Sequence, residues 1–214
     1  MSRYQEHRPE SLSERLHALF AAATAHASEA MSRWTGGQVS LALGSVEEVA
    51  PEEAVNRLDL RDELLTFVTV AITGAEAGRL MLAFDDENVD RLAFSLLGDR
   101  ACGNASEALR NSALCETANI LGSSYLATLS DTTDALLLPS PPTLVRDYGA
   151  CVLELAVMEH MLISDRLLLL PIDFANSAAS LRWQMFFVPA PGLMGLIRES
   201  LAAQCAVAAS PDQP

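Results

Sequence analysis

The sequence contains no lysine, and all 14 of its basic residues are arginines. A Walker A phosphate loop and a Schiff-base or pyridoxal-phosphate site each need a lysine, so these two kinds of chemistry are excluded. The 28 acidic residues give a formal net charge of −14, which repels nucleic-acid backbones and anionic lipid. We therefore expect no nucleic-acid partner.

Long apolar runs are also missing. The longest, such as Leu167–Ile172, are far shorter than the ~20 residues that a membrane-spanning helix needs. The first residues are charged and polar, unlike a signal or transit peptide. We therefore expect a cytoplasmic protein without membrane insertion.

Patterns typical of metal sites and disulfides are absent as well. The cysteines form no CxxC pair, and we expect reduced, mostly buried thiols at Cys102, Cys115, Cys151 and Cys205. The histidines lack the spacing of a zinc site, and no Ser/His/Asp order stands out; they are His7, His17, His26 and His160. The residues thus predict no metal of the protein's own.

Local patterns divide the chain into two similar parts. Each part has the order helix, strand, helix, strand, strand, helix, judged from apolar periodicity, caps and glycine stops. The helical pattern before Gly36 overlies the one that begins at Ser106 after a shift of 98 residues. We therefore expect one domain over residues 1–214, built from pseudo-repeats at about 11–98 and 105–204.

The expected fold class is α+β, with a pseudo-two-fold arrangement and long helices packed on one six-stranded, mixed or largely antiparallel sheet. The six strands are expected at residues 38–43, 64–72, 79–84, 135–138, 167–174 and 181–188. A helix is expected to follow Asp147 as its cap and to continue to about Met161.

A polar stripe runs along the second long helix. Residues three and four apart share a helix face, which groups four polar residues on one side: Ser112, Glu116, Asn119 and Ser123. The opposite side is apolar and predicts the face packed on the core: Leu114, Ala118, Leu121 and Tyr125. The residues alone leave open whether the polar stripe is a solvated face or a functional site.

The spacing Ser112-x3-Glu116-x2-Asn119-x22-Pro142 resembles the signature of the CheC/CheX/FliY family of response-regulator phosphatases. Further segments resemble the same family: E-T-A-N-I-L-G at 116–122, L-P-S-P-P at 138–142 and G-R-L-M-L-A-F at 78–84. The similarity covers about residues 12–204, and length and the doubled half are most like CheC. It implies a CheC-like fold.

The resemblance implies a phosphatase that hydrolyses the aspartyl phosphate of a CheY-like receiver domain in chemotaxis signalling. By this resemblance Asn119 positions the attacking water, and Glu116 pairs with the lysine of the receiver. Supporting roles are implied for Ser112, at the edge of the stripe, and for Pro142, which shapes the neighbouring segment. Mg²⁺ belongs to the receiver, so no cofactor of the protein's own is expected.

The family's first long helix often carries a second copy of the motif. Here the shift of 98 residues places Ala18 where Glu116 stands, Ala21 where Asn119 stands, and Gly44 where Pro142 stands. This predicts one active centre and a degenerate first site. An alternative function is a non-catalytic scaffold that binds CheD or flagellar switch components, since the FliM middle domain shares the fold but lacks the Glu/Asn pair.

Overall fold

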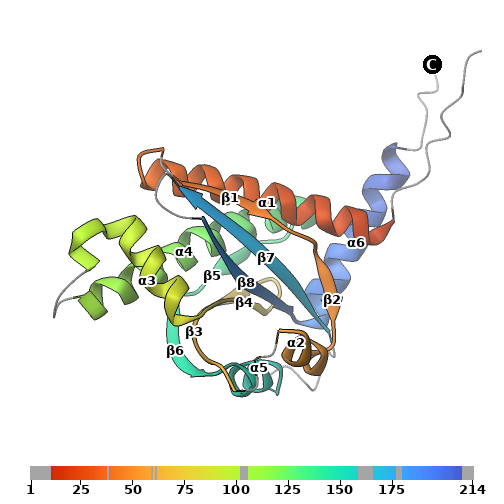
Figure 1. Cartoon of the computed structure of the whole chain (residues 1–214). Coiled ribbons are helices and arrows are strands. Elements are labelled where there is room, and N and C mark those ends of the chain that lie inside the picture. Colours follow the sequence, from red (N-terminus) through yellow and green to blue (C-terminus); the bar gives the residue numbers. More distant parts are fainter. Residues whose placement is uncertain are drawn as a thin grey trace, which may run out of the picture.

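The computed structural model describes residues 11–37, 39–58, 60, 62–101, 106–158, 166–176 and 180–208 (Figure 1). The helices are α1 (Leu12–Trp34), α2 (Pro51–Arg57), α3 (Asp86–Leu97), the 3-10 helix η1 (Gly98–Ala101), α4 (Ser106–Thr133), α5 (Gly149–Met158) and α6 (Pro191–Ala208). The strands are β1 (Val39–Leu43), β2 (Glu47–Val49), β3 (Leu64–Gly74), β4 (Gly78–Phe84), β5 (Leu137–Pro139), β6 (Thr143–Tyr148), β7 (Leu167–Asn176) and β8 (Ser180–Pro189).

The eight strands of the described residues lie in a single sheet, and every pairing between them is antiparallel. The order is β1-β7-β8-β4-β3-β5, with β2 also beside β7 and β6 also beside β3. The α+β class is confirmed, but the expected number of six strands is wrong. Because β1 and β2 follow each other along β7, and β5 and β6 along β3, the eight strands fill six places.

The two edges of the sheet are interrupted in the same way. On one edge Leu43 pairs with Ile172 and Glu47 with Leu169, so four steps along the edge face three steps along β7. On the other edge the pairs are Pro139–Ile72 and Thr143–Thr69, again four steps against three. Each edge therefore contains a bulge of one residue, and beyond each bulge the edge continues as a short strand that the sequence did not predict, β2 on one edge and β6 on the other.

Strand β6 was missed in the sequence because its residues do not alternate cleanly. It lies at an edge, and most of its side chains are exposed. Asp147 belongs to this strand and accepts a hydrogen bond from the Tyr148 N–H, whereas α5 begins only at Gly149. The prediction that Asp147 caps this helix is therefore wrong. Its expected end at Met161 lies outside the described residues.

The elements from α1 to α3, called the first half here, have the same order as those from α4 to α6, the second half. Each half gives its edge strands to the other, because β1 and β2 pair with β7 while β5 and β6 pair with β3. Strands β4 and β8 pair at the middle of the sheet. The division into two pseudo-repeats of one domain stays a proposal, and this interlocking favours it.

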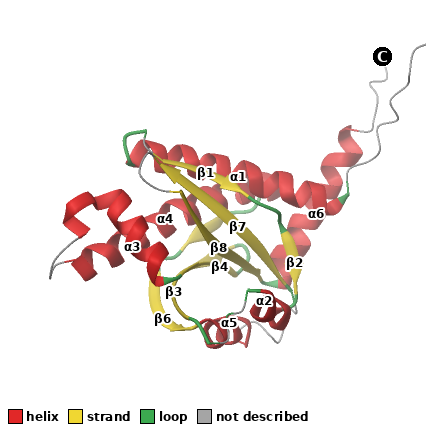
Figure 2. Ribbon diagram, viewed as in Figure 1, coloured by secondary structure: helices red, strands yellow, loops and turns green. Residues whose placement is uncertain are grey.

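Helices cover both faces of the sheet (Figure 2). The larger core lies between the sheet and the layer that contains α1, α4 and α6, and a smaller core lies beneath α2 and α5. The apolar stripe predicted on α4 is confirmed, since its residues are at most 2% exposed: Leu114, Ala118, Leu121 and Tyr125. The opposite stripe of α4 therefore faces away from the core.

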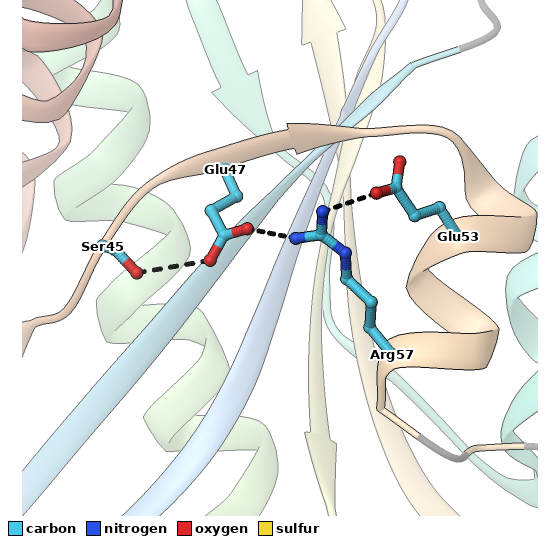
Figure 3. A network of polar contacts seen from close by, with 4 residues as sticks. All are labelled: Ser45, Glu47, Glu53 and Arg57. Carbon is cyan, nitrogen blue, oxygen red and sulfur yellow. Dashed lines mark hydrogen bonds and ion pairs between the residues drawn. The ribbon is translucent and has the colours of Figure 1, made fainter.

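Local capping residues mark the start of α1 and the end of α3. Helix α1 begins after Ser11, whose hydroxyl accepts from the Glu14 N–H while the Glu14 carboxylate accepts from the Ser11 N–H. Helix α3 ends at Gly98, whose φ of 58° favours glycine. The short α2 is joined to β2 by Arg57, which contacts both Glu47 and Glu53 (Figure 3).

Candidate functional site

The four residues singled out in the sequence come together at one open groove. Ser112, Glu116 and Asn119 line it from α4, and Pro142 lines it from the segment between β5 and β6. The groove has a volume of about 470 Å³, and Cys115 and residues 139–141 complete its lining. Residues 23 or more positions apart in sequence thus meet across a single cleft.

Helix α4 presents its polar stripe because its other face is anchored on the sheet. Gly122 lies against Val70 of β3, and a Cβ at this position would be 3.2 Å from Val70 Cγ1. The Thr117 hydroxyl is buried and donates to the Ala113 carbonyl at 2.9 Å, so it needs no solvent. The close approach at Gly122 sets the depth of the helix one turn beyond Asn119.

The second wall of the groove consists of residues 139–142, which we call the proline wall. It begins at Pro139, the last residue of β5, and forms the bulge opposite β3. Pro141 is exposed and Pro142 is half-buried. Because prolines carry no N–H and the Ser140 N–H donates to the Ala71 carbonyl, this wall leaves no backbone donor free for the groove.

The polar side chains of the groove are free to bind a partner molecule. Glu116 is exposed and Asn119 is half-buried, and neither side chain has a hydrogen-bond or ion-pair partner within the described ranges. The nearby Arg110 is directed to Asp90 of α3. Burial raises the pKa of the Cys115 thiol, which favours the neutral form beside these residues.

A carboxylate and an amide one helical turn apart can act together on one molecule. The carboxylate accepts hydrogen bonds or pairs with a cation, while the amide both donates and accepts. With no partner among the described residues, both side chains keep their full hydrogen-bonding capacity for an incoming group. The groove thus combines one negative charge with one positioning amide.

The corresponding face of the first half lacks these groups. Ala18 is exposed and Ala21 is half-buried on α1, so methyl groups replace the carboxylate and the amide. The His17 ring lies against the adjoining bulge, with Nε2 3.2 Å from the Gly44 carbonyl oxygen. The degenerate character of this face stays a prediction that these side chains favour.

The expected match between Gly44 and Pro142 is wrong. The two bulges are related by a shift of 96 residues, from Leu43 to Pro139 and from Glu47 to Thr143. The connection from the long helix to the edge strand is therefore two residues shorter in the second half. The structural counterpart of Pro142 is Val46, and that of Gly44 is Ser140.

The remaining sequence expectations have mixed outcomes. Cys151 is exposed and Cys115 is half-buried, so the expectation of mostly buried thiols is wrong for Cys151. The side chains of Cys102, Cys205, His7 and His160 lie outside the described residues. His26 contacts Thr128, with Nδ1 2.9 Å from Oγ1, rather than facing a second metal ligand.

In the described part of the chain, no group of three or more His, Cys, Asp and Glu side chains is arranged to hold a metal ion. None of its helices combines the length and apolar character of a membrane span.

A smaller cleft of about 180 Å³ opens near Asp85, Asn88 and Arg182, but these side chains bond to neighbours of their own, including Asp173.

The sequence assigned no role to four residues that line the groove: Cys115, Pro139, Ser140 and Pro141. Cys115 lies between the stripe and the core, and its position immediately before Glu116 is the signal that could have identified it. The sequence resemblance includes Ser140 in the segment 138–142 but assigns no role to it. Its contacts depend on β3, which is distant in sequence.

The sequence matches no family profile and no curated protein. The structure is similar to that of FliY from Thermotoga maritima, with a TM-score of 0.67 and 15% identity over 92% of this chain and 99% of that chain. It is similar to the FliM middle domain from H. pylori, with a TM-score of 0.56 and 13% identity over 87% of this chain and 96% of that chain. It also resembles a chain of the CheX-CheY-BeF3-Mg²⁺ complex from Borrelia burgdorferi, with a TM-score of 0.50 and 15% identity over 83% and 99% of the two chains.

These similarities establish the fold. The chain has the fold shared by FliY, CheX and the FliM middle domain, as the sequence resemblance implied. Identities of 13–15% carry no activity or partner from one protein to another. The specific likeness to CheC stays a prediction.

Proposed function

We propose that this protein is a phosphatase of phosphorylated CheY-like receiver domains in chemotaxis signalling. One observation carries the proposal: Glu116 and Asn119 stand one turn apart at a groove, without partners among the described residues. The similarity to a chain of the CheX-CheY-BeF3-Mg²⁺ complex supports a receiver as the partner. The proposed location is the cytoplasm, where such receivers act.

The chemistry asks little of the protein beyond positioning. An aspartyl phosphate is already an activated anhydride, so hydrolysis needs a water held in line with the breaking P–O bond. In the proposal the Asn119 carbonyl oxygen accepts a hydrogen bond from that water, while its NH₂ group faces an oxygen of the phosphorylated aspartate. Asn119 is half-buried against the helix, which limits the positions that its amide can take.

Glu116 supplies the charge complement in this proposal. Its carboxylate pairs with the active-site lysine of the receiver, and the present chain has no lysine that could compete for it. In this proposal the receiver binds the Mg²⁺, so the present chain provides no metal ligands. Ser112 and Pro142 bound the groove on either side of the pair and support its shape.

The test uses the purified protein with a phosphorylated CheY-type receiver. Asn119→Ala is expected to lower the dephosphorylation rate by about 100-fold, because the water loses its positioning group. Ser123→Ala is the matched control, since Ser123 is exposed on the same stripe but does not line the groove. Wild-type rates in Asn119→Ala would refute the catalytic assignment.

A second candidate function is a non-catalytic interaction protein. The observation that favours it is the first half, where Ala18 and Ala21 leave the exposed face of α1 without the polar pair. The similarity to the FliM middle domain supports the same alternative. Its partners would be CheD or components of the flagellar switch. A pull-down that recovers these proteins, together with no activity toward phosphorylated receivers, would favour the scaffold over the phosphatase.

A further inference from the structure

One serine of the proline wall is hydrogen-bonded to the neighbouring strand β3 through both its backbone and its side chain. Three of the four residues 139–142 are prolines, so Ser140 supplies the only backbone N–H of this segment. That N–H donates to the Ala71 carbonyl at 2.8 Å, and the Ala71 N–H donates to Ser140 Oγ at 2.9 Å. The Ser140 hydroxyl donates in turn to the Pro141 carbonyl at 3.0 Å. Backbone and side chain of one residue thus connect β3 to the bulge.

The first half has the same bulge without the side-chain contact. The Gly44 N–H donates to the Pro171 carbonyl at 2.8 Å, as the Ser140 N–H does to Ala71. Glycine has no hydroxyl, and Pro171 has no N–H that could donate to one. A Cβ on Gly44 would also lie only 3.1 Å from Pro171 Cγ. The hydroxyl contact therefore belongs to the half that carries the Glu–Asn pair.

We infer that Ser140 is a positioning residue for the groove, an inference that rests on the proposed function. It holds Pro141 and Pro142 opposite Glu116 and Asn119, so that an entering receiver meets a wall at a set distance. The Ser140 side chain is engaged with β3 and with Pro141 rather than with a reacting group. It therefore acts on binding of the receiver and not on the chemical step.

The experiment compares Ser140→Ala with the matched control Thr73→Val. Thr73 lies on β3, and its hydroxyl likewise bridges to the segment that pairs with β3, donating to the Leu138 carbonyl at 3.1 Å without lining the groove. Each variant is measured for steady-state dephosphorylation of a phosphorylated CheY-type receiver and for hydrogen exchange of the Ala71 amide. Ser140→Ala is expected to raise KM and to speed exchange at Ala71, each about threefold to tenfold, with kcat within about twofold of wild type. Thr73→Val is expected to change neither.

Unchanged KM and unchanged exchange at Ala71 in Ser140→Ala would overturn the inference, as would equal effects in Thr73→Val. A fall in kcat at constant KM would also overturn it, because Ser140 would then act on the chemical step. A different result would contradict the proposed function itself, namely an Asn119→Ala variant that is as active as the wild type. In that case exchange at Ala71 still decides whether Ser140 holds the proline wall.

Discussion

Gly122 of α4 lies directly against Val70 of β3, where a Cβ would come within 3.2 Å of Val70 Cγ1 and 3.4 Å of Cγ2. This contact sets how deeply α4 sits on the sheet. Since Asn119 lies one turn earlier on the same helix, the depth at Gly122 also sets the height of the groove's polar edge. A small residue at the helix–sheet contact thus helps to set the shape of the groove.

Gly122→Leu is expected to destabilise the protein by about 1–3 kcal/mol, because the larger side chain overpacks the contact with β3. The free energy of unfolding, measured by chemical denaturation, checks this. Gly195→Ala is the control, since a Cβ there meets nothing within 4 Å and helix propensity favours alanine by about 1 kcal/mol. A Gly122→Leu variant as stable as the wild type would show that α4 can lift from β3 without cost.

Thr24 and Tyr125 are buried between α1 and α4, with Oγ1 and Oη 2.5 Å apart. Thr24→Val is expected to cost about 1–3 kcal/mol, because the buried Tyr125 hydroxyl loses its partner. Tyr125→Phe is expected to cost less, about 0.5–1.5 kcal/mol, because Thr24 still donates to the Phe20 carbonyl at 2.8 Å. Denaturation of both variants tests the order, and the reverse order would contradict it.

Stability at alkaline pH is expected to depend on Tyr125. Burial raises the pKa of its hydroxyl above the ordinary value of 10.0. Because its pKa is raised in the folded state, Tyr125 keeps its proton at pH values where the unfolded chain has lost it. Its contribution to the free energy of unfolding is therefore fully present below pH 10 and is lost as the pH rises above about 10, by up to about 1.4 kcal/mol per pH unit. The chain has no lysine that titrates in this range. The free energy of unfolding is therefore expected to fall less steeply between pH 9 and pH 11 in Tyr125→Phe than in the wild type. The same slope in both proteins would contradict the assignment.

Grafting the polar pair onto the first half is not expected to create a second active centre. The variant Ala18→Glu/Ala21→Asn, made together with Asn119→Ala, would carry the pair opposite a bulge that has Gly44 where the second half has Ser140. Dephosphorylation of a phosphorylated receiver is expected to stay at the level of Asn119→Ala alone. Recovery of activity would indicate that the helix stripe suffices without the proline wall.

The helices and the polar stripe could be predicted because their signals are local. The caps at Ser11 and Gly98, and the 3.6-residue spacing that buries Tyr125, depend on residues within one or two turns. Strand β6 could not be predicted in this way, since its exposed edge position removes the alternation. The wrong equivalence of Gly44 and Pro142 arose because a two-residue difference in a connection leaves no trace in a single shift.

The sequence by itself determined the absence of lysine chemistry, the α+β class and the presence of Glu116 and Asn119 on one helix face. These follow from composition and from the geometry of a helix turn. Only the tertiary structure decided that Pro142 lies across a groove from that face and that Ser140 is bonded to Ala71. Such contacts depend on how β3, α4 and the edge bulge are arranged in space. The periodicity of any one segment holds no information about its distance from another.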